Sequence, residues 1–145
     1  MTPARRPIDA KIRHRSAPCH DLLGRRVISA TAGTSELTFD VGESFTNGMG
    51  NIQGGFLAAM LDSAMGAALS TVLEEGERPP TVEMKINFIK PAKPGTLRGT
   101  ARVVHRGRSV VFVEGDLHDD SASLLARGTS TNIILLRPSE KGSDA

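Results

Sequence analysis

Hydrophobic and polar positions change their spacing along this chain of 145 residues, and the changes mark out its elements. Over Arg25–Val41 apolar and polar residues tend to alternate, with a break at Ala32-Gly33-Thr34, which predicts a β-hairpin. From Asn51 to about Leu73 the apolar residues recur at helical spacing. This helix is apolar around nearly its whole circumference, so we expect it to be buried.

Four strand-like segments follow the helix, after a polar stop at Glu74–Pro80. They cover Thr81–Lys90, Leu97–Arg106, Ser109–His118 and about Leu124–Leu136. The order of two strands, one helix and four strands predicts an α+β domain, with an antiparallel sheet of about six strands packed on one long helix. One helix covers only part of such a sheet, so the edge strands favour pairing with a second copy of the chain.

The length allows one domain, which we place at residues 20–137. Residues 1–19 are predicted to form a loose basic arm and residues 138–145 a disordered tail. The first 26 residues carry a net charge of +5 and the rest carry −3, so the sequence does not predict a nucleic-acid-binding body. The arm is either a solvated tail or an Arg-rich organelle-targeting segment, since it lacks the apolar run of a secretory signal.

The composition excludes several classes of site. There is no Trp and no Tyr, which disfavours an aromatic platform for single-stranded nucleic acid. The single cysteine, Cys19, forms neither an internal disulfide nor a cysteine metal cluster, which is typical of a reducing compartment such as the cytoplasm. The four histidines lack metal-ligand spacing, so we expect no metal. A membrane span over residues 52–73 is rejected because Asp62 at its centre would cost ~2.5–3.5 kcal/mol on insertion.

Asp62 is the one ionisable side chain between Ser44 and Leu73, and it lies near the middle of the predicted helix. A buried carboxylate is costly unless it is paired, and this helix offers no cation. The same helix face carries small or flexible residues that leave room for another backbone or a ligand: Gly55, Ala58, Met65 and Gly66. Asp62 is therefore either a structural carboxylate bonded to a loop or partner subunit, or a catalytic group.

Gly54 and Gly55 stand at the expected start of this helix, where N–H groups have no intrahelical partner. The helix dipole favours negative charge at that end. Without a Cβ, a substrate carbonyl can approach such an N–H closely, as in an oxyanion hole. The alternative is a flexible helix start that packs closely against a neighbour.

These residues carry a resemblance to a known family. The run from Asn47 to Gly55 (NGMGNIQGG), followed by Ala58–Asp62 (AAMLD), resembles hotdog-fold acyl-CoA thioesterases of the phenylacetate-pathway (PaaI-like) group, whose pattern is approximately N-x-x-G-x-x-H-G-G-x-x-x-x-L-x-D. Thr81–Met84, Phe88–Ala92 and Val103–Ser109 resemble that family's strands. Covering about residues 20–136, the resemblance implies a hotdog fold, with the sheet wrapped around the helix, and hydrolysis of an acyl-CoA to free acid and CoA. The small or flexible side chains of Ala58, Ala59 and Met65 favour a medium-chain or aryl acyl group.

The resemblance also implies roles for single residues. Asp62 would act as general base or nucleophile, and the Gly54 N–H would polarise the thioester carbonyl. Asn47 would position the carbonyl or the attacking water, and Thr81 would hold that water. Gln53 stands where the family most often has His; it can still donate and accept hydrogen bonds, but a proton-transfer role there is in doubt. In the family, the site lies between subunits.

Substrate-binding candidates follow from the same resemblance. Coenzyme A, a part of the substrate and not a cofactor, needs cations for its anionic end. The candidates are Arg106 and Arg108 on either side of Gly107, and then Lys90 and Lys93. The acyl pocket is expected to involve Gly55, Ala58, Ala59 and Met65.

We therefore expect a cytoplasmic homodimer, assembled as a dimer of dimers, that acts on acyl-CoA and has no nucleic-acid or membrane partner. The alternative is a non-catalytic acyl-CoA-binding or regulatory hotdog module, which would bind the same ligands without turnover. A dehydratase or hydratase is disfavoured, because such chemistry usually wants a catalytic His near the helix and none lies between His20 and His105.

Overall fold

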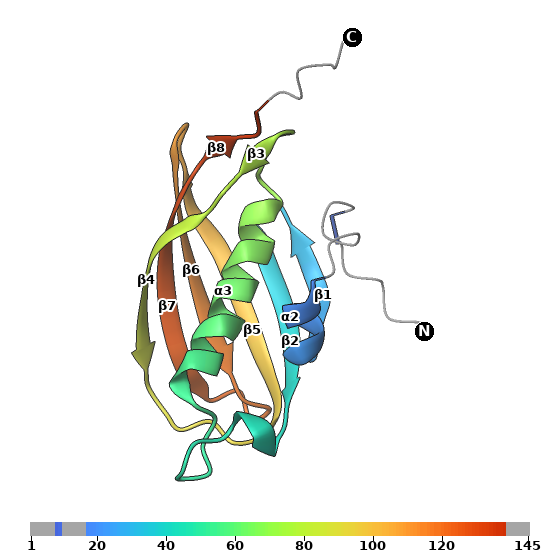
Figure 1. Cartoon of the computed structure of the whole chain (residues 1–145), viewed down its shortest axis with the longest axis vertical. Coiled ribbons are helices and arrows are strands. Elements are labelled where there is room, and N and C mark those ends of the chain that lie inside the picture. Colours follow the sequence, from blue (N-terminus) through green and yellow to red (C-terminus); the bar gives the residue numbers. More distant parts are fainter. Residues whose placement is uncertain (1–7, 10–16, 139–145) are drawn as a thin grey trace, which may run out of the picture.

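One antiparallel sheet of six strands wraps around a single long helix in the computed structural model, which describes residues 8–9 and 17–138 (Figure 1). The strands follow the spatial order β1-β2-β5-β6-β7-β4. In chain order they are β1 (Arg25–Thr31), β2 (Thr34–Val41), β4 (Thr81–Phe88), β5 (Gly95–Arg106), β6 (Val110–His118) and β7 (Leu124–Ile133). The predicted α+β class and the sheet around a central helix are confirmed.

The shorter elements lie around this sheet. They are α2 (Pro18–Leu22), the 3-10 turn η1 (Glu43–Phe45) and the two-stranded pair of β3 (Glu77–Arg78) with β8 (Leu135–Leu136). The strand predicted to reach Leu136 is thus divided, because its last residues leave β7 to pair with β3. Most of the predicted arm, 1–19, and tail, 138–145, lies outside the described residues, and those boundaries stay predictions.

The predicted hairpin is confirmed as β1 and β2. Its two turn residues, Ala32 and Gly33, both have positive φ, 48° and 77°. That conformation is typical of the tight turns whose twist matches a two-stranded antiparallel ribbon. The turn therefore fixes the register of β1 against β2.

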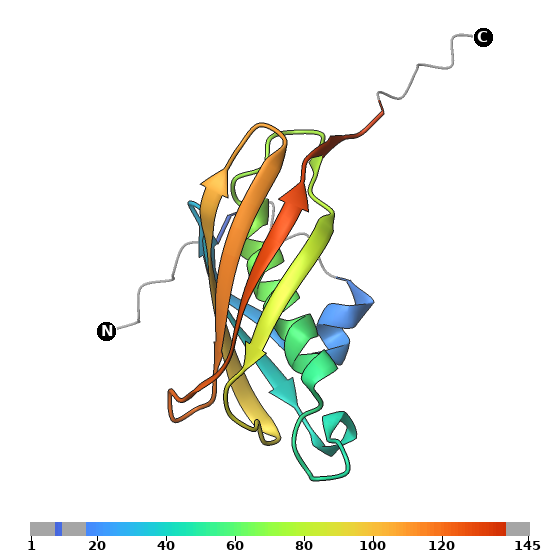
Figure 2. The same ribbon diagram turned by 90° about the vertical axis from the view of Figure 1, so that its left-hand side faces the viewer.

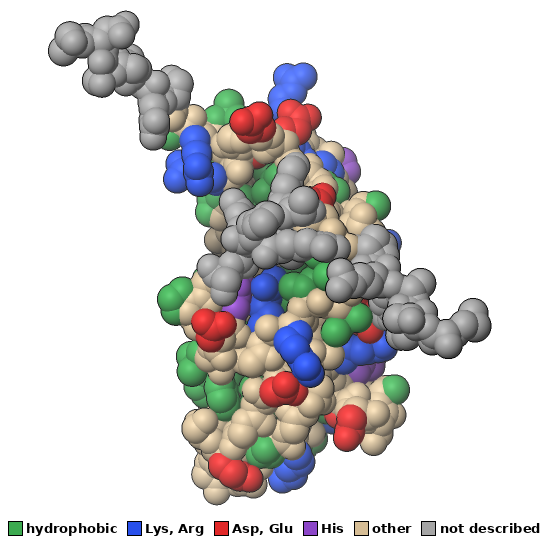
Figure 3. Space-filling view, turned by 90° about the vertical axis from the view of Figure 1, so that its right-hand side faces the viewer, with side chains coloured by type: hydrophobic (Ala, Val, Ile, Leu, Met, Phe, Trp, Pro, Cys, Tyr) green, Lys and Arg blue, Asp and Glu red, His purple; other side chains and the backbone are tan. Residues whose placement is uncertain are grey.

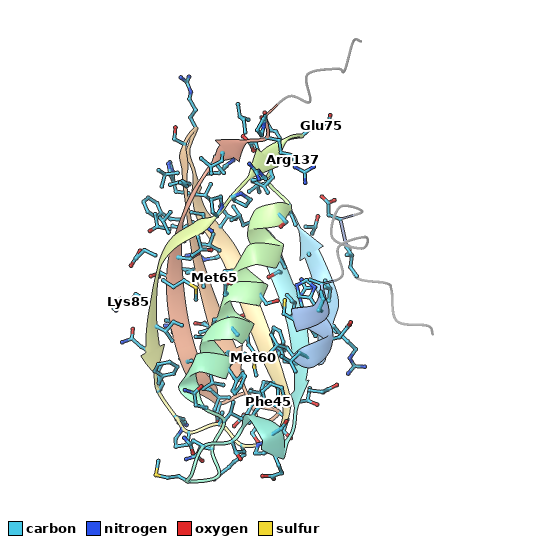
Figure 4. The ribbon with its side chains drawn as sticks, viewed as in Figure 1. Phe45, Met60, Met65, Glu75, Lys85 and Arg137 are labelled. Carbon is cyan, nitrogen blue, oxygen red and sulfur yellow. The ribbon has the colours of Figure 1, made fainter. Side chains whose placement is uncertain are left out.

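The long helix, α3, runs from Gly54 to Ser70 and is shorter than predicted at both ends. At its start the backbone N–H of Ile52 bonds to Ala92 O and that of Gln53 to Phe45 O, so these residues are tied to loops. The sheet approaches α3 closely at glycines: a Cβ on Gly99 would lie 3.1 Å from the Cβ of Ala64. The core accordingly lies between α3 and the sheet, as the sticks in Figure 4 show.

The prediction that α3 is buried is correct for only one side of the helix. The sheet covers one side of the helix (Figure 2), and the opposite side, with Gly55, Ala59 and Asp62, remains exposed. β4 pairs with β7 on one side only and is an edge of the sheet. Val82 and Phe88 of β4 are 54% and 56% exposed. An open face of the helix and an open apolar edge strand therefore lie on the same molecule.

Candidate active site

Asp62 projects from the side of α3 that the sheet does not cover, and the first residue of β4 bonds to it. Thr81 donates a hydrogen bond from Oγ1 to Asp62 Oδ1 at 3.4 Å. Partial burial raises the pKa of Asp62 above its ordinary value, and the Thr81 hydrogen bond opposes that shift. Because desolvation disfavours the charged form, the ionised carboxylate is a stronger base than one in water.

Two buried residues of β7 hold the Thr81 hydroxyl. Asn132 donates from Nδ2 to Thr81 Oγ1 at 2.9 Å and to Pro79 O at 3.2 Å, and Ser130 donates from Oγ to Asn132 Oδ1 at 2.9 Å. Because Thr81 Oγ1 accepts from Asn132, its own hydrogen is left to point at Asp62. Sequence reasoning missed Asn132 and Ser130. The sequence did contain a signal for them: Ser130 and Asn132 are polar residues two positions apart in a strand, so both face the interior, where apolar residues are expected.

At the start of α3, the backbone N–H groups of Gly54 and Gly55 have different surroundings. Gln53 is the N-cap residue, and its Oε1 accepts the N–H of Gly55 at 2.8 Å. Gly54 N–H has no hydrogen-bond partner among the described residues. Gly54, not Gly55, therefore offers the free backbone donor, and the Gln53 side chain is engaged as a helix cap.

A cavity of about 320 Å³ lies beside this free N–H. Asn47 lines it and accepts the N–H groups of Met49 and Asn51 through Oδ1, at 3.0 and 3.2 Å, which leaves Nδ2 as its donor toward a ligand. Phe88 forms a further wall, close enough that a Cβ on Gly54 would lie 3.2 Å from its ring. The cavity is also lined by Leu57, Ile89, Lys90 and Ala92. It joins Asn47, Gly54 and Lys90 of the predicted site.

A separate cavity of about 250 Å³ lies beside Asp62, between α2 and α3. Its lining residues are His20, Arg25, Asp62, Ser63, Gly66, Ala67 and Ser70. A third cavity, of about 500 Å³, lies over β2, β5, β6 and β7 and contains none of the predicted site residues. Its charged residues pair with each other, Arg102 with Glu114 and Arg127 with Asp116, so it offers no free charge.

One protomer does not bring the two halves of the predicted site together. Gly54 and Asp62 are eight residues apart on one helix, which at ~1.5 Å per residue separates them by about 12 Å along its axis. A reacting carbonyl carbon must lie roughly 3 Å from both the attacking group and the oxyanion donors. Asp62 with Thr81, and Gly54 with Asn47, are therefore two half-sites.

The other predicted residues fall into three places. Gly55 and Ala59 lie on the exposed side of α3 and Ala58 is half-buried, whereas Met65 is 1% exposed and packs toward Gly115 of β6. Figure 4 shows Met65 between α3 and the sheet. Met65 is thus a core residue and does not line the cavity beside Asp62.

The predicted coenzyme A cations are divided between the two ends of α3. Arg106, next to Gly107, pairs with Glu77 and donates to Val72 O at 3.5 Å, beyond the C-terminal end of the helix. Arg108 is exposed there. Lys90 lines the cavity at the helix start, and Lys93 donates to Gly50 O at 3.5 Å in the preceding loop. The lysines, not the arginines, accompany Gly54.

Two features were looked for among the described residues and not found. No group of three or more of their His, Cys, Asp or Glu side chains is placed to hold a metal ion. No helix in the described part of the chain has the length and apolarity needed to cross a membrane.

Comparison with known proteins identifies the class. The family model of the thioesterase superfamily matches residues 49–126. Acyl-coenzyme A thioesterase 13 of Homo sapiens is 32% identical over 107 residues, 72% of this chain and 76% of that protein. A phenylacetic acid degradation-related protein from Ralstonia eutropha is 34% identical with a TM-score of 0.78, over 82% of this chain and 92% of that one.

The fold itself also resembles that of a solved PaaI protein. The PaaI protein of Escherichia coli superimposes with a TM-score of 0.79 at 24% identity, over 87% of this chain and 90% of that one. The sheet, the helix and these matches define a hotdog-fold thioester hydrolase, as expected from the resemblance to the PaaI-like group. The chain belongs to the thioesterase superfamily.

We predict that Asp62→Asn raises the melting temperature at pH 7. The pKa of Asp62 is raised in the folded chain, so folding stability is lost as pH rises from the unfolded value of ~3.9 through the folded pKa. Asn keeps the shape and cannot ionise. The melting temperatures of variant and wild type should therefore differ by an amount that grows as the pH rises above ~3.9 and becomes constant above the folded pKa of Asp62.

Asp116→Asn is the matched control with the opposite sign. A hydrogen bond from Arg127 is the main cause that lowers the pKa of Asp116, so its ionised form stabilises the fold at pH 7 and that stability is lost on acidification. This variant should melt below the wild type at pH 7. A melting temperature of Asp62→Asn at or below that of the wild type at pH 7 would contradict the account of Asp62.

Proposed function

We propose that the protein hydrolyses a medium-chain or aryl acyl-CoA thioester to the free acid and CoA, in a homodimer that shares its active sites between subunits. The observation that carries this proposal is the division of the site into two halves, about 12 Å apart along one helix. One half has a carboxylate base but no oxyanion donor, and the other has the donor but no base. Each half therefore needs the complementary half from a second chain.

The edge strand β4 supports a particular dimer. Thr81 at its start bonds to Asp62, and Phe88 at its end packs over Gly54. A two-fold axis that pairs β4 antiparallel with its copy sets the start of one strand beside the end of the other. Asp62 of one protomer then faces Gly54 and Asn47 of its partner. The same pairing covers the exposed Val82 and Phe88.

The chemistry needs no group from outside these residues. Asp62 either takes a proton from the water that adds to the thioester carbon or attacks that carbon itself. In both cases the carbonyl oxygen becomes an oxyanion, which the Gly54 N–H and the Asn47 Nδ2 stabilise. Collapse of the intermediate breaks the carbon–sulfur bond and releases CoA as the thiolate, which is then protonated. On the water route this step gives the free acid directly, whereas on the nucleophilic route it leaves an anhydride between the acyl group and Asp62, which water then hydrolyses to the free acid.

Charge and location complete the proposal. Lys90 and Lys93 lie near the Gly54 half-site, where they suit the phosphates of coenzyme A. Cys19 is an exposed free cysteine, which is typical of a reducing compartment and supports a cytoplasmic location. Pairing of two dimers into a tetramer stays a prediction.

We predict that both half-sites are required for turnover. Loss of thioester absorbance in the ultraviolet is followed for acetyl-, octanoyl-, phenylacetyl- and benzoyl-CoA. Asp62→Asn should lower kcat at least ~100-fold, because it removes the base or nucleophile. The kcat of Gly54→Pro should be about 100-fold or more lower than the kcat of Gly54→Ala, because only proline removes the backbone N–H.

Comparison of Gly54→Pro with Gly54→Ala measures the contribution of the Gly54 N–H. Gly54 is the first helical residue, where proline is tolerated, and Gln53 before it has φ −63° and ψ 138°, a conformation that proline accepts. Both substitutions add a Cβ toward Phe88, so that contact cancels in the comparison. Saturable acyl-CoA binding without turnover, equal in wild type and Asp62→Asn, would establish the non-catalytic binding module instead.

We predict a positioning role for Asn132. Asn132→Ala should lower kcat about tenfold with KM unchanged, because loss of one hydrogen bond of ~1.4 kcal/mol frees the Thr81 hydroxyl from its orientation. The acid limb of the pH–rate profile should move to higher pH, since the Thr81 bond lowers the pKa of Asp62. In a Thr81→Val background the same substitution should have little further effect on kcat.

Ser35→Ala is the matched control for a purely structural loss. Ser35 is also buried in a strand under α3 and donates to Ala64 O at 2.7 Å, two residues along the helix from Asp62. Its loss should lower the melting temperature and leave kcat and the pH profile unchanged. Equal effects of the Asn132 and Ser35 substitutions on kcat would remove the positioning role.

A further inference from the structure

The cavity between α2 and α3 carries a cation that no acidic residue in the described part of the chain neutralises. Arg25, the first residue of β1, lines this cavity and forms no ion pair with a described residue. Its Nε is buried and has no hydrogen-bond partner. Partial burial lowers the pKa of Arg25, and an electrostatic interaction with Cys19 opposes that shift. Figure 3 shows the face of the molecule that carries α2 and β1.

The side chain of Arg25 is held in place from α2. Its Nη1 donates to Nδ1 of His20 at 3.3 Å, and the same nitrogen accepts the backbone N–H of Ala17 at 3.2 Å. Nδ1 of His20 therefore serves as the acceptor for both of these donors. The guanidinium is therefore oriented by His20 while its charge and its Nε stay unmatched.

The opposite wall, formed by α3, adds a second unmatched group and open space. Ser63 Oγ is buried without a hydrogen-bond partner and lines the same cavity. Gly66, one turn after Asp62, is so open that a Cβ there would meet no atom within 4 Å. A guanidinium without an ion-pair partner is costly when it is partly buried, so the open space beside Arg25 favours an anionic ligand.

We propose that this cavity receives the acyl part of the substrate and selects acyl groups that end in a carboxylate, which Arg25 binds. The proposal rests on the proposed function, because Asp62 lines the same cavity. Charge-assisted hydrogen bonds from the guanidinium to a carboxylate in the cavity would neutralise its charge. Methyl-ended or aryl groups would leave the partly buried cation unpaired, so among the acyl groups of the proposed function we expect them to be the poorer substrates.

The size of the cavity sets the length of the acyl group. At the ~30 Å³ that a water occupies in the liquid, about 250 Å³ holds roughly eight non-hydrogen atoms. Beyond the thioester carbonyl, a dicarboxylic acyl chain of about six or seven carbons has about seven or eight non-hydrogen atoms, which matches that number. The substrate class is therefore an ω-carboxyacyl-CoA of about six carbons.

The experiment compares two thioesters of equal shape. Adipoyl-CoA ends in a carboxylate, and 6-methylheptanoyl-CoA ends in an isopropyl group of the same outline. We expect the wild type to prefer adipoyl-CoA at least ~10-fold in kcat/KM, and Arg25→Met to lose that preference. Arg26→Met is the matched control and should keep it, because the neighbouring Arg26 lies exposed and pairs with Asp40 at 3.6 Å.

Further variants keep the test decisive. Arg25→Gln replaces Arg25→Met if the latter fails to fold, with folding measured by thermal unfolding. Gly66→Val should narrow the cavity and lower kcat/KM more for adipoyl-CoA than for acetyl-CoA. Equal rates on the two matched thioesters in the wild type, or a preference that survives loss of Arg25, would overturn the carboxylate site while leaving thioester hydrolysis intact. Absence of turnover on every thioester would instead overturn the proposed function, and this inference with it.

Discussion

The packing of α3 on one side only is the constraint on which the rest of the structure depends. Gly99 and Gly115 let the sheet approach the helix closely, so Ala64 and Met65 fill the core without space for a ligand. A sheet wrapped that tightly around one side leaves the other side to solvent or to a partner. Asp62, the proposed base or nucleophile, lies on that second side, and its position follows from helical spacing against the buried stripe.

A single helix also explains why the site is divided. Its free N–H groups lie at its first turn, and Asp62 lies about two turns further on. Rearrangement of side chains within one chain cannot close the ~12 Å between Gly54 and Asp62. In the proposed dimer, a two-fold axis places the start of one helix beside Asp62 of the other. In our account the edge strand β4 provides that axis, because Thr81 and Phe88 tie its two ends to the two half-sites.

Much of this fold was predictable from the sequence because it rests on local rules. Period-two segments, one apolar helix and Gly33 in a tight turn were enough to predict the sheet and its hairpin, and Asp62 was conspicuous as a lone charge in an apolar helix. The contacts between distant residues were not predictable. Asn132 reaches Thr81 across 51 residues, and the choice of Gly54 over Gly55 depends on where the Gln53 side chain turns. Met65 was assigned to the wrong side of α3 because i+3 spacing from Asp62 lies at the boundary between its two faces.

Complementation between two inactive variants tests the shared site most directly. Asp62→Asn and Gly54→Pro would be produced together with different tags, and dimers containing one chain of each would form alongside the two parent dimers. Our account predicts about a quarter of wild-type activity for a random equal mixture, because half of the dimers are mixed and each of these has one site with both groups intact. Mixed dimers no more active than either parent would contradict a site built from two chains.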